Sequence, residues 1–273
     1  MSFGISATGH ARTIVSASTQ VGAKLPDPVT DAYERTLRIA ADVQRMHPGQ
    51  EALAVAVTAA LDAGHDPASD PEVQRIHLAG LLANPGLTGM VEAIAQGQME
   101  QTFIEHADLI VKALVRPFDK AAAVMVDTHS KLGGLALEDT AGVVARGGAA
   151  ADEWAKGRAA TDTLEAINAA WLALANLTRL APVDSNRPSL RYTDPTVQQW
   201  TDLGLTGRKV KPWEAVSLGL PLSLPTMAGY RNRSAALTDG LEAMDAAEVP
   251  VDRSRAAVRD WTAKVGAAKV GAA

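Results

Sequence analysis

The feature that most constrains the fold is a long stretch, Leu87–Pro182, in which apolar residues recur at steps of three and four. That spacing places them on one face of an α-helix. The stretch is interrupted at Gly133 and Gly134, and glycine tolerates the backbone of a sharp reversal. The pattern therefore predicts two helices folded back on each other as a hairpin. Six large apolar residues are expected to carry its internal packing: Phe103, Ile110, Leu114, Phe118, Trp171 and Leu174.

The first arm of this hairpin is predicted to begin at Thr88, just after Asn84-Pro85-Gly86. Pro117 interrupts the apolar pattern, and a proline inside a helix removes one hydrogen-bond donor and crowds the preceding turn. A kink is therefore expected near residues 113–116. At 1.5 Å per residue such an arm would reach roughly 65 Å, which is more than a compact domain of this size needs.

The return arm is predicted to begin near Glu138-Asp139, and its first half contains unusually small residues. Two interpretations of this half stay open. Glycine weakens a helix by about 1 kcal/mol relative to alanine, which favours a break near Gly147. Alternatively, small side chains let another helix approach closely, either the first arm or a second subunit. The second interpretation makes this half a candidate interface, with Gly147, Gly148, Ala151, Trp154 and Gly157.

Prolines and glycines divide the chain into four predicted segments. Residues 1–26 are expected to form an extended arm, and residues 27–86 a unit of short helices. Residues 87–182 form the hairpin, and residues 183–273 form a C-terminal helical region with predicted helices at 226–247 and 251–265. Together they predict an all-α fold: a long kinked helical hairpin with flanking short-helix units and extended termini.

The C-terminal region contains a leucine–proline run, residues 218–225, with two prolines four positions apart. A regular helix cannot include both prolines, so the run is predicted to be extended. It either covers the protein's own core or lies in an apolar groove of a partner. The second alternative adds four residues to the candidate interface: Leu218, Leu220, Leu222 and Leu224.

Composition limits the classes of function. The net charge of −5 is mild and no segment is basic enough to indicate a nucleic-acid groove. No run approaches the 18 or so uncharged apolar residues of a membrane span. The sequence has no cysteine, which excludes disulfides and thiolate metal sites.

The sequence contains no established catalytic or cofactor motif: it lacks a phosphate-binding Gly-Lys-Ser/Thr loop, a Gly-x-Ser-x-Gly elbow and a paired-histidine zinc helix. No catalytic, cofactor-binding or metal-ligating residue is predicted, and the chain is not expected to be an enzyme. The alternative is a helical metal-dependent hydrolase that uses His47, His65 and Asp66, with Asp70 nearby. Against it, Asp66 and Asp70 each precede a proline, which is typical of helix caps.

The first ten residues, Met-Ser-Phe-Gly-Ile-Ser-Ala-Thr-Gly-His, resemble the start of uncharacterised proteins encoded among the structural genes of actinobacterial phages. The resemblance implies a virion or assembly setting. Long arms also expose apolar stripes that one hairpin cannot bury. The sequence therefore predicts a structural or assembly protein that binds itself and other structural proteins, such as those of a capsid. It would be cytoplasmic during assembly and then part of the virion. A monomeric adaptor that binds one protein partner through the leucine–proline run is the remaining alternative.

Overall fold

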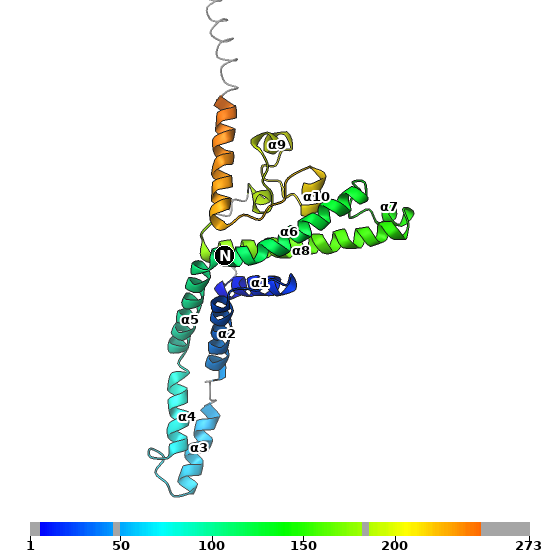
Figure 1. Ribbon diagram of the computed structural model, residues 1–273. Coiled ribbons are helices and arrows are strands. Elements are labelled where there is room, and N and C mark those ends of the chain that lie inside the picture. The colour runs from blue at the N-terminus through cyan, green and yellow to red at the C-terminus, as the bar shows by residue number, and fades with distance from the viewer. Residues whose placement is uncertain (1–5, 46–49, 182–185, 247–273) are drawn as a thin grey trace, which may run out of the picture.

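The computed structural model describes residues 6–45, 50–181 and 186–246, which are 76% helical and contain no strand. The predicted all-α class is confirmed. Two assemblies of helices are visible in Figure 1: a body, and an arm that projects from it. The predicted helix at 251–265 and the first five residues lie outside the described part of the chain.

The centre of the body is α8 (Gly148–Thr178), which lies between α1 (Ala7–Gln20) and α6 (Ala107–Lys131). The predicted hairpin corresponds to α6 and α8. Gly133 and Gly134 both have positive φ, 58° and 76°, as the reversal requires. The six residues predicted to pack inside the hairpin are all buried: Phe103, Ile110, Leu114, Phe118, Trp171 and Leu174.

The return arm is interrupted where one interpretation expected it. Asp139 caps the short α7 (Thr140–Ala145) by accepting a hydrogen bond from the backbone N–H of Gly142 at 2.8 Å. Gly147 then adopts φ 86°, and α8 begins at Gly148. A side chain is strained at this φ, so the glycine permits the change of direction between α7 and α8.

The first arm differs from the prediction, because it consists of two helices. Helix α5 (Pro85–Glu105) begins at the cap Asn84, not at Thr88, and ends at His106, where α6 starts. Backbone N and ring Nδ1 of His106 both lie within 3.1 Å of the carbonyl oxygen of Thr102, and His106 leaves helical geometry at φ −107° and ψ 11°. Helix α6 continues through Pro117. The chain therefore changes direction at His106.

The predicted extended arm at residues 1–26 is wrong for the described residues, because α1 is a helix packed on α8. Ser6 caps it by accepting a hydrogen bond from the Gly9 N–H at 3.1 Å. Its buried residues, Ala11, Ile14, Ala17 and Ser18, have helical spacing. All but Ile14 are small, which lets the two helices lie close together.

The arm is two helices thick. The chain leaves the body along α2 (Asp27–Arg45) and α3 (Gln50–Asp62), and returns along α4 (Pro71–Leu82) and α5 (Figure 1). Helix α2 pairs with α5, and α3 pairs with α4. We refer to α3, α4 and residues 85–94 of α5 as the distal arm.

The remaining elements cover the body on the side of α6 and α8 (Figure 1). They are η1 (Pro188–Arg191), α9 (Val197–Asp202), α10 (Pro212–Ser217) and a helix at 227–246 that points away from the body on the side opposite to the arm. Helix α9 begins at Val197 with Thr196 and Gln199 as a capping box.

Candidate interaction surface

Two residues of the candidate interface on α8, Gly157 and Trp154, contact other parts of the same chain. A Cβ atom at Gly157 would lie 3.0 Å from Trp213 Cζ3 and 3.1 Å from Thr128 Cγ2. Gly157 thus lets α6 and α10 approach α8. The indole of Trp154 is half-buried and donates to the carbonyl of Leu137 at 2.9 Å.

The other small residues predicted for an interface remain exposed. They are Gly147, Gly148 and Ala151, at the start of α8. A Cβ atom at Gly147 or Gly148 would meet nothing within 4 Å. A neighbour at these three positions stays a prediction, whereas Gly157 is buried and is not available to one.

The leucine–proline run covers the protein's own core. Leu220 is buried, and Leu218, Leu222 and Leu224 are half-buried against the body. Leu218 and Gly219 form the turn that ends α10, and the rest of the run lies outside any helix and forms one antiparallel bridge, between Thr193 and Leu222. These contacts favour the first alternative for the run, in which the leucines pack within the chain.

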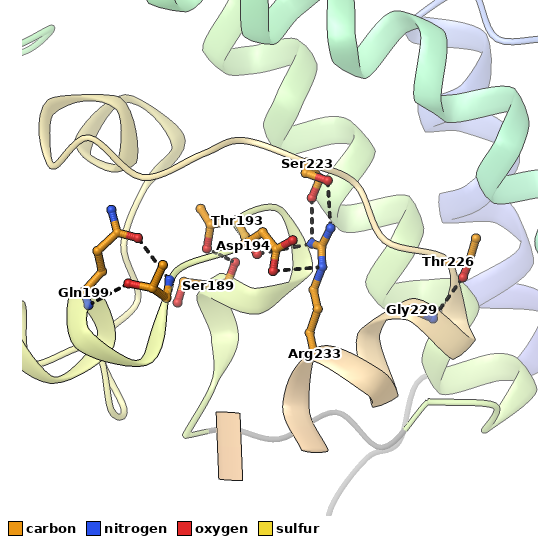
Figure 2. Close-up of polar contacts among 9 residues, drawn as sticks. Ser189, Thr193, Asp194, Gln199, Ser223, Thr226, Gly229 and Arg233 are labelled. Atoms are coloured by element: carbon orange, nitrogen blue, oxygen red, sulfur yellow. Dashed lines mark hydrogen bonds and ion pairs between the residues drawn. The ribbon is translucent and has the colours of Figure 1, made fainter. Parts of the chain in front are cut away.

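A half-buried arginine holds the run in place. Arg233, on the helix at 227–246, donates to the carbonyl and hydroxyl oxygens of Ser223 at 3.0 and 2.7 Å, and to the carbonyl of Thr193 at 3.2 Å (Figure 2). Its Nε lies 3.4 Å from a carboxylate oxygen of Asp194. Burial lowers the pKa of Arg233, and the Asp194 carboxylate counteracts this. The network joins three segments of one chain.

Of the residues of the hydrolase alternative that the structure describes, Asp70 is the N-cap of α4 and Asp66 lies at the turn that precedes it. Asp70 accepts hydrogen bonds from the N–H groups of Glu72 and Val73 at 2.9 and 3.1 Å, and these bonds and the nearby His65 lower its pKa. Asp66 accepts from the Ala68 N–H at 3.1 Å. His65 Nδ1 lies 3.7 Å from Asp70 Oδ2, and His47 is outside the described residues. No group of three metal-ligating side chains converges within residues 6–45, 50–181 and 186–246.

The distal arm carries the largest exposed apolar surface. Twelve large hydrophobic side chains are exposed in the described chain, and nine of them lie on the distal arm. Met90 is 64% exposed and Val55 is 63% exposed. The nine are Val55, Leu61, Leu78, Leu81, Leu82, Leu87, Met90, Val91 and Ile94.

These side chains form stripes along the helices and do not scatter singly. Leu87, Met90, Val91 and Ile94 recur at steps of three, one and three on α5, which places them on one face. Single exposed leucines are ordinary on a protein surface, whereas a continuous exposed apolar patch marks a site of interaction. The distal arm therefore carries an unpartnered apolar face.

A groove runs between α3 and α4, with a volume of about 770 Å³. Small apolar side chains line it: Ala52, Val55, Ala56 and Ala59 from α3, and Ile76 and Ala79 from α4. Glu51, Glu72 and Arg75 stand beside them, and Arg75 pairs with Glu72 at 2.6 Å. The lining has the size and polarity of a surface that receives a further helix.

The distal arm is also acidic. Residues 50–94 contain six carboxylates (Glu51, Asp62, Asp66, Asp70, Glu72 and Glu92) and one arginine (Arg75), which gives a net charge of −5. This equals the net charge of the whole chain. The acidic charge is therefore concentrated on the segment that exposes the apolar stripes.

No single helix in the described ranges is long and apolar enough to cross a membrane. Helices α4 and α5 together have sufficient length and apolar character, but they are bent by 62° at the break between them.

Sequence reasoning missed the distal arm, because it assigned residues 27–86 to a compact unit. A signal was present: between His77 and Glu92 no residue is charged, and this run crosses the joint between α4 and α5. Apolar residues also occur all round α3, α4 and α5 and not along one stripe. Helices with that distribution need apolar neighbours on more than one side.

The chain matches no known protein family, no curated protein and no solved structure. The geometry of the arm and the body is therefore the basis for a proposal about function.

Proposed function

We propose that the protein is a homo-oligomeric structural or assembly protein, in which the distal arm of each copy binds a neighbouring copy. The observation that carries this proposal is the distribution of exposed large hydrophobic side chains, nine of twelve of which lie on the distal arm. The body exposes fewer large hydrophobic side chains than the distal arm does. Most of its large apolar side chains are buried, among them Trp171, Phe118 and Leu164, and three are exposed.

A two-helix layer explains why the arm needs a partner. Each helix of the pair α3–α4 buries one side against the other helix and leaves its remaining sides to solvent. Covering a half-exposed leucine, valine or methionine contributes about 1 kcal/mol. Nine such residues would supply on the order of 9 kcal/mol, which is comparable to the cost of association.

The setting of this assembly is proposed from the first ten residues, which resemble the start of proteins encoded among phage structural genes. On that basis the neighbours include other structural proteins of a phage particle. The protein would then occupy the cytoplasm during assembly and the virion afterwards.

Light scattering coupled to size exclusion tests the proposal. At micromolar concentration the chain is expected to elute with a mass that is a multiple of 28.5 kDa. The triple variant Val55→Gln/Leu81→Gln/Met90→Gln makes one exposed position polar on each helix of the distal arm. It is expected to elute at the mass of one chain, because the apolar contact is weakened while the buried core is unchanged.

The matched control is Leu109→Gln/Val126→Gln, since both residues are about half exposed on α6 of the body. This variant is expected to keep the mass of the unaltered protein. A monomeric mass for the unaltered protein at micromolar concentration would contradict the proposal, and so would an arm variant that keeps the oligomeric mass.

A further inference from the structure

The groove between α3 and α4 has no occupant among the described residues. Its walls are small apolar side chains from two antiparallel helices, and carboxylates stand at its rim. A third helix with one apolar face flanked by basic residues would fit this combination, because the apolar face would fill the groove and the basic residues would pair with the carboxylates at the rim.

One segment of this chain has that pattern. In residues 251–269 the apolar residues Val251, Val258, Trp261 and Val265 recur at steps of seven, three and four, which places them on one helical face. The same segment contains five basic residues (Arg253, Arg255, Arg259, Lys264 and Lys269) and two acidic ones (Asp252 and Asp260), for a net charge of +3. It lies outside the described residues, and the sequence predicts a helix in its first part.

The two surfaces are complementary in charge. The distal arm carries −5 and the segment carries +3, although the chain as a whole is only mildly acidic. Opposite charge steers encounter and disfavours wrong partners. The same acidic charge disfavours an anionic lipid surface as the occupant of the groove, because lipid headgroups of that kind attract basic segments.

Residues 251–269, when helical, cannot reach the groove of their own chain. The helix at 227–246 points away from the body on the side opposite to the arm (Figure 1), and its twenty residues span about 30 Å. Helix α5, with 21 residues, holds α4 roughly 30 Å from the body. Residues 247–250 span at most about 14 Å when fully extended. The occupant therefore has to come from another copy.

We propose that residues 251–269 of one copy bind as a helix in the groove between α3 and α4 of a neighbouring copy. This inference rests on the proposed homo-oligomeric function and names the segment that binds the distal arm; of the nine exposed side chains, Val55 lines the groove. The two surfaces differ, so the contact is head-to-tail: each copy has one groove and one segment. Such contacts form closed rings or open filaments.

Mixing two variants of the full chain tests this contact. The groove variant is Ala56→Lys/Ala79→Lys, which places bulk and positive charge in the groove. The segment variant is Val258→Asp/Trp261→Asp, which removes the apolar face of the segment. Each variant alone is expected to be monomeric. An equimolar mixture is expected to show twice the mass of one chain, because one intact groove and one intact segment remain, and no larger species forms.

Dimer formation in the mixture also shows that the segment variant has a folded groove and that the groove variant keeps a functional segment. The mass of the mixed dimer is expected to fall towards that of a monomer as salt is raised, since the charges that attract the two surfaces are screened. Leu109→Gln/Val126→Gln serves again as the control that leaves association unchanged.

Three outcomes would overturn the inference, and they are distinguishable. A segment variant that keeps the full oligomeric mass would refute this contact while leaving the homo-oligomer intact. A monomeric unaltered chain would refute the proposed function as well. Co-sedimentation of the unaltered chain with phosphatidylcholine vesicles, lost in the groove variant, would assign the groove to a membrane surface.

Discussion

Replacing Trp171 with alanine is expected to lower the free energy of unfolding by about 3–5 kcal/mol. Trp171 is fully buried in the last third of α8, and its ring lies 5.1 Å from that of Tyr230. Its indole Nε1 also donates to the carbonyl oxygen of Pro225 at 2.8 Å. The substitution would leave a cavity among α8, the leucine–proline run and the helix at 227–246, and would deprive a buried carbonyl of its donor.

Urea unfolding followed by far-ultraviolet circular dichroism measures this loss. Val144→Ala is the matched control, because Val144 is 78% exposed and its truncation should change the stability by less than about 0.5 kcal/mol. If Trp171→Ala and Val144→Ala were equally stable, the contact of the leucine–proline run with α8 would not be part of the core.

The second large effect is expected at Gly157, where a leucine should destabilise the protein by about 3 kcal/mol. Already a Cβ atom at this position would lie 3.0 Å from Trp213 Cζ3, 3.1 Å from Thr128 Cγ2 and 3.3 Å from Leu137 Cδ2. The remaining carbons of leucine would have to displace α10 or α6. The gain in helix propensity over glycine, about 1 kcal/mol, is too small to offset this.

Gly148→Leu is the control for this substitution, because it adds the same side chain to the same helix where no heavy atom lies within 4 Å. It is expected to be neutral or slightly stabilising in the same urea titration. A Gly157→Leu protein as stable as Gly148→Leu would show that α6, α8 and α10 do not approach as closely as described.

The hairpin was predictable because its signals are local. A glycine pair marks the reversal, and apolar residues at helical spacing mark the buried faces of α6 and α8. The cap at Asp70 and the helix stop at Gly64 were predictable for the same reason. Caps and turns depend on a few adjacent residues, so a single sequence contains the information that specifies them.

The break at His106 was not predictable from such signals. Proline is the usual marker of an interrupted helix, and Pro117 lies inside α6. The residue type of His106 does not mark the end of a helix. The chain turns at His106 because Phe103, before the joint, and Ile110, after it, are both buried in the core. Tertiary packing therefore determines that the helix is interrupted at His106 and not at Pro117.

The course of the arm was likewise not predictable. The uncharged run between His77 and Glu92 indicates that these helices need apolar neighbours, but nothing near residues 27–86 specifies whether the helices fold into a compact unit or run outwards in pairs. The pairing of α2 with α5 joins residues about sixty positions apart, as in the hydrogen bond from Thr36 Oγ1 to the Ala95 carbonyl at 3.3 Å. The pairing of α2 with α5 keeps α3 and α4 away from the body, and the apolar faces of α3 and α4 therefore stay exposed.

The central claim is that another copy covers the distal arm, and a single cysteine at Val55 tests it most directly. The sequence contains no cysteine, so the thiol of Val55→Cys would be the only one in the protein. At micromolar concentration a water-soluble maleimide is expected to react slowly with this thiol, and dilution to the monomer is expected to restore fast reaction. Val126→Cys, on the body, should react fast at both concentrations, because Val126 is exposed in a single copy. Equally fast reaction of both thiols at micromolar concentration would contradict the claim.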